Sequence, residues 1–224
     1  MNAPEIARRI DSTNLKLNSS DADLCTLCDE AAEYGFATVC IYPADVTICS
    51  TILYNTPVKV CTVIGFPHGR SSLAAKRVEI LEAKEHGASE VDVVINYHNL
   101  RTGEKGLAAE EVSTLCEVAR EVGLGIKIIV ETSYLKKKQK LDALAICEKA
   151  KVDFIQISTG FAPAVADEAD VALLNNKRSN NIRIKASGGI QTIGSALKLM
   201  EAGADRVGIQ KAGKLLAAAK ELAQ

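Results

Sequence analysis

Short apolar runs alternate with longer amphipathic segments along nearly the whole chain. The runs are rich in Val and Ile and of strand length, a pattern typical of strands buried on both faces. They lie near residues 10–14, 37–42, 58–65, 90–96, 125–131, 152–157, 182–187 and 205–209. The amphipathic segments predict helices over 21–33, 73–86, 109–121, 140–149, 164–174, 192–201 and 211–223.

This alternation predicts the fold class. A strand followed by a helix and another strand indicates parallel pairing with crossover helices. Eight such units in 224 residues predict an α/β protein, a single-domain (β/α)₈ TIM barrel spanning 1–224. An open, doubly wound sheet is the alternative. The absence of a Gly-rich dinucleotide turn after the first strand argues against it.

Composition narrows the set of partners. About 47% of residues are hydrophobic, 25% are charged, and the formal net charge is -1. Such a chain offers no overall attraction to nucleic acid or to an anionic membrane. No apolar run approaches the roughly 20 residues of a membrane-spanning helix, and residues 1–9 lack an apolar signal core. We therefore expect a cytoplasmic protein without nucleic-acid or membrane partners.

The cysteines and histidines do not form a sequence motif for a metal. Seven cysteines are an odd number, which favours a reducing compartment over a disulfide framework. Cys25 and Cys28 fall within a predicted helix and are interpreted as small core-facing residues. His68, His86 and His98 are isolated, so we expect no metal and no cofactor. Of the three, His68 and His98 lie in predicted loops where a substrate contact is conceivable.

Alternation along the strands predicts which side chains enter the barrel. In TIM barrels the site lies at the carboxyl ends of the strands, and every second strand residue points inward. The inward set on the fourth to seventh strands is Asp92, Val94, Asn96, Lys127, Ile129, Glu131, Phe154, Gln156, Ser158, Arg183, Lys185 and Ser187. The charged residues Asp92, Glu131, Lys127 and Lys185 form a candidate catalytic group, because buried charges require partners. An ion network that merely fills the barrel centre is the structural alternative.

Two glycine turns are candidates for binding phosphate. Ser158–Gly160 and Ser187–Gly189 each follow a strand, and the second precedes the helix that begins near Thr192. Backbone N–H groups in such turns and at helix starts bind anions. The residues that we expect to bind substrate or phosphate are Ser158, Thr159, Gly160, Ser187, Gly188, Gly189, Gly208 and Lys211.

Taken in order, these motifs resemble the deoxyribose-phosphate aldolase family over essentially the whole chain. The segments that carry the resemblance are 65–69 (GFPHG), Lys76 and Glu79, 87–96 (GASEVDVVIN), 127–132 (KIIVET), 158–161 (STGF) and 185–190 (KASGGI). The resemblance implies a metal-independent class I aldolase that joins acetaldehyde to glyceraldehyde 3-phosphate. It also implies that Asp92 relays protons, that Lys185 assists an imine-forming lysine on the sixth strand, and that the chain forms a homodimer.

The chain departs from this family at three positions around the same face. Gln156 occupies the place of the imine-forming lysine. The first strand reads Asp11-Ser-Thr13 where the family has Asp-His-Thr, and the eighth strand is followed by Gln210 and Lys211 where the family has Ser-Ser. Three changes at one mouth indicate natural divergence. They predict an altered anion site and altered or reduced activity.

The loss of the lysine changes the expected chemistry. An amine attacks a carbonyl only when it is unprotonated, and a neighbouring ammonium lowers its pKa. An amide cannot form an imine. Lys185 or Lys127 could substitute, but each lacks one cationic neighbour, so we expect both to be more protonated and less nucleophilic than their family counterparts.

Three functional hypotheses follow. The first is an aldolase-type carbon–carbon lyase for a small aldehyde or phosphorylated sugar, in which Lys185 forms the imine and Asp92 moves protons through water. The second is an isomerase, dehydratase or cyclase that uses acid–base chemistry without a Schiff base. The third is a non-catalytic sugar-phosphate binder. The fold does not discriminate among them.

Overall fold

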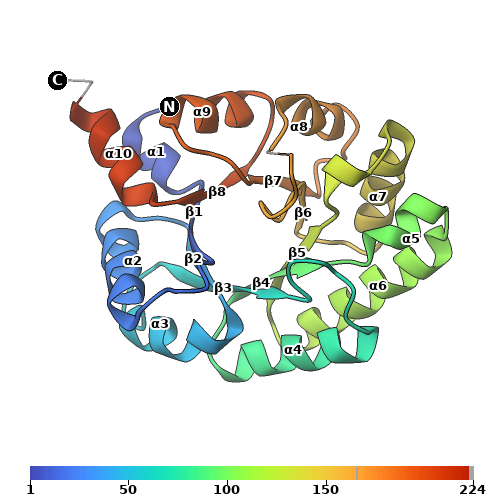
Figure 1. Cartoon of the computed structure of the whole chain (residues 1–224), viewed down its shortest axis with the longest axis horizontal. Coiled ribbons are helices and arrows are strands. Elements are labelled where there is room, and N and C mark those ends of the chain that lie inside the picture. Colours follow the sequence, from blue (N-terminus) through green and yellow to red (C-terminus); the bar gives the residue numbers. More distant parts are fainter. Residues whose placement is uncertain (165, 222–224) are drawn as a thin grey trace.

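The computed structural model, which describes residues 1–164 and 166–221, contains a closed barrel of eight parallel strands in sequential order (Figure 1). The strands are β1 (Ile10–Asn14), β2 (Thr38–Ile41), β3 (Lys59–Ile64), β4 (Glu90–Val94), β5 (Gly125–Ile129), β6 (Phe154–Gln156), β7 (Arg183–Ser187) and β8 (Arg206–Gln210). β1 pairs with both β2 and β8, which closes the ring. The predicted (β/α)₈ TIM barrel is therefore confirmed.

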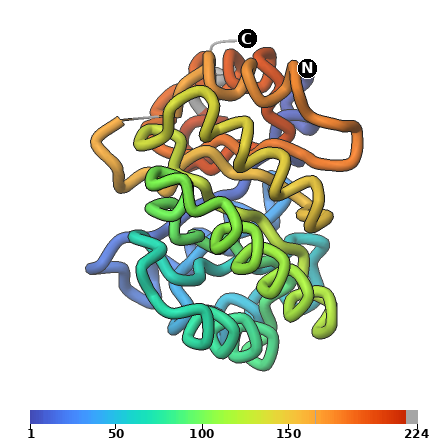
Figure 2. Tube along the Cα trace, turned by 90° about the vertical axis from the view of Figure 1, so that its right-hand side faces the viewer, coloured from blue at the N-terminus to red at the C-terminus, as the bar shows by residue number. Residues whose placement is uncertain are grey.

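Helices surround the barrel as an outer layer (Figures 1 and 2). They are α1 (Ala3–Ala7), α2 (Asp21–Tyr34), α3 (Val46–Ile52), α4 (Leu73–Glu85), α5 (Tyr97–Thr102), α6 (Lys105–Glu121), α7 (Lys137–Lys149), α8 (Glu168–Asn175), α9 (Ile193–Glu201) and α10 (Ala212–Glu221), with 3₁₀ turns η1 (Pro43–Asp45) and η2 (Thr132–Tyr134). Figure 2 shows α4, α6 and α7 in a row, in agreement with the contacts of α6 with α4 and with α7. No helix within the described part of the chain is both long and apolar enough to cross a membrane.

The predicted helices differ from the observed ones mainly in length and number. The short helices α1, α3 and α5 were not predicted, because they are too short to show a clear helical period. The helix predicted over 164–174 instead begins at Glu168, where the Asp167 side chain caps it by accepting from the Ala169 N–H at 2.9 Å. Residues 222–223 of the last predicted helix lie outside the described residues.

The hydrophobic core lies between the barrel and its helices. The outward-facing strand residues, such as Val91, Val93, Ile126 and Ile128, are at most 4% exposed and pack against the helix layer. Alternate residues point into the barrel, where charged side chains lie beside a small apolar cluster that includes Cys40, Cys61 and Val63. One cysteine prediction is wrong: Cys28 is buried, but Cys25 is exposed, because it lies on the solvent side of α2.

Candidate active site

Three of the four predicted charged residues meet inside the barrel. The register pairs Asp92 of β4 with Lys127 of β5, so both side chains point inward. Lys127 Nζ lies 2.9 Å from Asp92 Oδ1, and Lys185 Nζ of β7 forms an ion pair with Asp92 Oδ2. All three are 1% exposed. Asp92 therefore holds two ammonium groups, one on each carboxylate oxygen.

Three further charges, which the sequence analysis did not assign to the site, complete this cluster. Asp11 lies 2.8 Å from Lys185 Nζ, and Glu90 lies 2.7 Å from Lys127 Nζ. Arg206 bridges the two carboxylates, at 3.1 Å from Asp11 and 2.8 Å from Glu90. We call the set of Asp11, Glu90, Asp92, Lys127, Lys185 and Arg206 the interior ion network. Its three carboxylates balance its three cations.

The network keeps its carboxylates ionised. Burial alone would raise the pKa of Glu90, but Lys127 and Arg206 lower it to about 2. Burial likewise opposes ionisation of Asp11 and Asp92, yet the neighbouring cations hold the pKa of each below its ordinary value. All three carboxylates are therefore charged at neutral pH.

The same contacts keep the two lysines protonated. Burial alone would lower the pKa of Lys185, but Asp11 and Asp92 raise it above its ordinary value. For Lys127, Asp92, Cys61 and Glu90 outweigh burial and raise the pKa well above its ordinary value. Since only a neutral amine attacks a carbonyl, this geometry disfavours either lysine as a substitute imine former.

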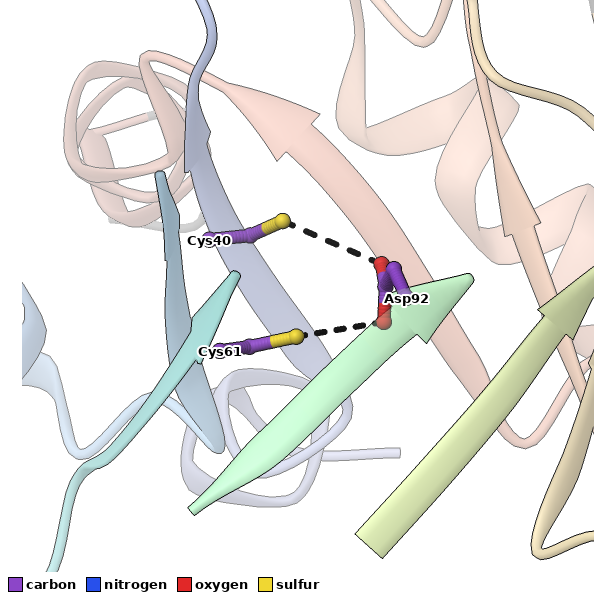
Figure 3. Close-up of side chains that lie close together, drawn as sticks. All are labelled: Cys40, Cys61 and Asp92. Atoms are coloured by element: carbon purple, nitrogen blue, oxygen red, sulfur yellow. Dashed lines mark hydrogen bonds between the residues drawn. The ribbon is translucent and has the colours of Figure 1, made fainter. Parts of the chain in front are cut away.

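Two thiols face the same aspartate (Figure 3). Cys40 of β2 and Cys61 of β3 are register partners, and their sulfur atoms lie 3.8 and 3.1 Å from the Asp92 carboxylate. Two sulfurs and a carboxylate within 4.8 Å of one another are donors that a soft metal ion accepts. The ammonium groups of Lys127 and Lys185 already occupy this carboxylate, however, and would repel a cation. Sequence spacing gave no hint of this cluster, since the three residues come from different strands.

Glu131 does not join the network. Its carboxylate accepts hydrogen bonds from the backbone N–H of Thr159 at 3.0 Å and from the Thr159 hydroxyl at 2.5 Å. Its backbone has a positive φ of 49°, which turns the chain away from the strand direction and ends the alternation on which the prediction relied. The predicted grouping of Glu131 with Asp92 and the lysines was wrong, and the residue braces a mouth loop instead.

Gln156 lies inside the barrel beside Lys185, its register partner on β7. Its amide Nε2 donates to the Ser158 carbonyl oxygen at 3.1 Å and to the Ser187 hydroxyl oxygen at 2.9 Å. The side chain is thus attached to both predicted glycine turns. It supplies no nucleophile at the place where the family resemblance predicts one.

The two glycine turns and the end of β8 line one cavity of about 520 Å³. Of the predicted phosphate-binding residues, those that line it are Thr159, Gly160, Ser187, Gly188, Gly189, Gly208 and Lys211. Ser158 supports the turn from behind, since its hydroxyl accepts from the Gly160 N–H at 3.0 Å. Lys214 adds a second ammonium to the cavity wall. We call this group of turns the anion cradle.

The close approach of the two turns requires glycine. Gly160 and Gly188 have φ values of 79° and 99°, which L side chains rarely adopt. A Cβ atom on Gly188 would lie 2.8 Å from the Gly160 Cα. In the first turn, the N–H groups of Thr159, Gly160 and Phe161 already donate to Glu131 and to the Ser158 and Thr159 hydroxyls. A ligand would therefore approach the backbone of the second turn, where Gly188 and Gly189 carry no side chain.

Other sequence candidates lie apart from the cavity. His68, His86 and His98 are exposed, and none of them lines it. Arg183 lies at the start of β7, its guanidinium stacks over the Phe154 ring at 3.9 Å, and it does not line the cavity.

A separate buried ion pair fixes two mouth loops from outside the barrel. Lys76 of α4 is fully buried, and its ammonium contacts Glu111 of α6 at 2.6 Å and donates to the Gly69 carbonyl at 2.8 Å. Glu111 in turn accepts from the Asn96 N–H at 2.9 Å. These contacts tie the loops after β3 and β4 to the helix layer.

Comparison with known proteins identifies the relatives of this barrel. The family model described as DeoC/LacD family aldolase matches residues 6–216. The chain belongs to this family. It is 44% identical over 209 residues to the deoxyribose-phosphate aldolase of Caldicellulosiruptor saccharolyticus, covering 93% of this chain and 95% of the relative. The corresponding protein of Thermococcus kodakarensis is 40% identical over 223 residues, covering 99% and 100%.

A solved structure supports the same family membership. The tetrameric deoxyribose phosphate aldolase of Aeropyrum pernix superposes with a TM-score of 0.90 at 32% identity, covering 98% of this chain and 93% of that one. The predicted family resemblance is confirmed, and membership in it makes the chain an aldolase-type lyase.

Proposed function

We propose that the chain is a carbon–carbon lyase that acts on a small aldehyde or phosphorylated sugar without forming an imine at position 156. The observation that carries this proposal is the position of Asp92 and Lys185, paired inside the barrel next to Gln156, which is itself attached to the anion cradle. The relatives named as deoxyribose-phosphate aldolases support the reaction class. The amide at position 156 supports slow turnover by comparison with an imine-forming enzyme.

Each group of residues has a separate role in the proposed reaction. The cradle and Lys211 hold the phosphate. The Asp92 carboxylate, directly or through water, accepts the proton of the hydroxyl next to the bond that breaks. Lys185, as an ammonium, stabilises the enolate oxygen that develops on the other fragment, since a fixed charge in a dry site is effective there. The proton that Asp92 accepted then passes, directly or through the same water, to the enolate carbon, which completes the cleavage and restores the Asp92 carboxylate.

Turnover and trapping measured side by side test this proposal. The protein is incubated with 2-deoxyribose 5-phosphate, the released aldehyde is measured by a coupled assay, and a second sample is treated with borohydride and analysed by mass spectrometry. We expect slow turnover that is lost in Asp92→Asn, with no lysine adduct. An adduct on Lys185 would replace this mechanism by the imine mechanism. Tight binding without any turnover would favour a sugar-phosphate binder.

An acid–base enzyme without a Schiff base, such as an isomerase, is a second candidate. Lys127 and Lys185 are held in the protonated form, so they can serve as fixed positive charges beside an enolate or enediolate but not as nucleophiles. Interconversion of a carbonyl phosphate without cleavage, dependent on Asp92, would support it. The homodimer remains a prediction, and light scattering of the purified protein tests it.

A further inference from the structure

Glu131 combines a buried carboxylate with a left-handed backbone. The residue is 1% exposed, and within the described part of the chain its carboxylate is bonded to hydroxyl and N–H groups and to no cation. Its φ of 49° lies in a region that residues other than glycine rarely adopt. A buried charge without a counter-ion and a left-handed backbone both cost free energy, and such costs concentrate at functional sites.

Both features lead to one contact, the pair of hydrogen bonds with Thr159. Since a carboxylate only accepts, the Thr159 hydroxyl donates its proton to Glu131, at 2.5 Å. The hydroxyl oxygen is left to accept, and the Phe161 N–H donates to it at 3.1 Å. The carboxylate of Glu131 therefore fixes the direction of each bond in this short chain.

The chain of bonds ends at a wall of the cavity. Thr159 and Phe161 both line the cavity, and the Phe161 ring contacts the Phe66 ring at a centroid distance of 5.1 Å and an interplanar angle of 87°. The backbone N–H groups of the first turn are used within the protein, so this wall offers a ligand no free backbone donor. The phosphate is left to the second turn with Lys211 and Lys214, and the wall is left to the carbon chain.

We propose that Glu131 is a positioning residue, which holds Thr159 and Phe161 against the carbon chain of a phosphorylated sugar bound through its phosphate at the second turn. The inference rests on the proposed function, because it takes a phosphorylated sugar as the ligand. Glu131 does not itself line the cavity, so it acts through Thr159. Inorganic phosphate has no carbon chain, and its binding should not depend on Glu131.

Isothermal titration with two ligands tests this role and needs no turnover. Glu131→Met keeps the length of the side chain but has no oxygen. In this variant we expect the affinity for 2-deoxyribose 5-phosphate to fall about 10-fold and that for inorganic phosphate to stay within about 2-fold of wild type. Glu131→Gln should bind both ligands like the wild type, because its amide oxygen can accept both bonds from Thr159.

A matched control and a double variant sharpen the test. Glu117→Met removes an exposed carboxylate on α6 that accepts from the Ser113 hydroxyl at 3.1 Å, and it should leave both affinities unchanged. Thr159→Val keeps the shape of the side chain without the hydroxyl, and it should weaken sugar-phosphate binding selectively. In the double variant the two losses should not multiply, because Glu131 acts through Thr159.

Unchanged sugar-phosphate affinity in Glu131→Met, equal losses for both ligands, or losses that multiply in the double variant would overturn the inference. If Glu131→Met does not fold, Thr159→Val provides the same comparison of the two ligands. Selective loss of sugar-phosphate affinity in a protein that does not cleave the sugar phosphate would refute the proposed function and support the role of Glu131. A wild-type protein that does not bind 2-deoxyribose 5-phosphate would refute both.

Discussion

The interior of the barrel and its mouth hold polar groups of different kinds. The interior ion network consists of six charged side chains, paired with one another and almost entirely shielded from water. The anion cradle consists of two glycine turns at the end of the barrel, with Lys211 exposed at its edge. The first is fixed by burial and charge balance, and the second by backbone conformation.

The difference predicts that the two regions respond to substitution independently. The interior ion network is internally neutral, so the uncharged Gln156 beside it does not change its charge balance. At the mouth, Gln210 and Lys211 line the cavity next to the cradle's glycines and make no ion pair with the network. The network and the cradle meet at Gln156, whose amide is bonded to both glycine turns.

The largest effect is expected when a lysine is introduced at position 156. In Gln156→Lys, the new amine would be a seventh ionisable group beside a balanced network, and burial together with Lys185 would favour its neutral form. We expect borohydride to trap an adduct at residue 156 and turnover of 2-deoxyribose 5-phosphate to rise on the order of 10⁴-fold or more, the range associated with a catalytic nucleophile.

Gln156→Arg is the matched control for this variant. Arginine is similar in length but always protonated, so it should give neither an adduct nor a gain in rate. If Gln156→Lys behaves like Gln156→Arg, the interior would not be competent for imine chemistry, and the independence of network and nucleophile would be refuted.

Removing one charge from the network should destabilise the fold strongly. In Asp92→Asn the ammonium groups of Lys127 and Lys185 lose a buried partner, and we expect the free energy of unfolding to fall by about 3 to 5 kcal/mol. Urea denaturation at neutral pH measures this. Asp142→Asn is the control, because Asp142 pairs with Lys105 at 2.6 Å on the surface and should cost under about 1 kcal/mol. Similar losses in the two variants would contradict the structural role of the network.

The sequence predicted the barrel and much of the network for a simple physical reason. Alternation along apolar strands identifies charged residues that must face inward, as it did for Asp92, Lys127 and Lys185. The same rule applies to Glu90 and Arg206, which lie two residues before Asp92 and Gly208 on their strands. They were missed because the predicted inward set began at Asp92 on the fourth strand and included no residue of the eighth.

Other features of the site depend on contacts that sequence does not encode locally. Glu131 lies four residues after Lys127, so alternation predicts that it faces inward. Its left-handed backbone directs the side chain toward Thr159 instead. Cys40 and Cys61 meet Asp92 only because three strands lie side by side. These features required coordinates.

Acid should lower the free energy of unfolding through the interior ion network. Glu90 has its pKa lowered from the ordinary value of 4.5 to about 2 in the folded state. Its contribution is therefore complete above pH 4.5 and is lost as the pH falls toward 2. This difference corresponds to about 3 kcal/mol. Urea denaturation at a series of pH values should show this decrease, and Glu90→Gln should flatten the curve. Constant stability down to pH 2 would show that the network does not control acid unfolding.

The smallest effect is expected at the mouth of the barrel, at Lys211. Lys211 is exposed, so solvent screens its charge, and Lys211→Ala should weaken phosphate binding only about 3- to 5-fold at low salt. Titration with inorganic phosphate measures this, and the difference should shrink as salt is added. Lys198→Ala removes an exposed lysine on α9 that does not line the cavity and should bind phosphate like the wild type.

Unfolding free energy should stay unchanged in both variants, because neither lysine belongs to the interior ion network. A loss of stability in Lys211→Ala comparable with that in Asp92→Asn would mean that mouth and interior are energetically coupled, and the distinction between them would fail.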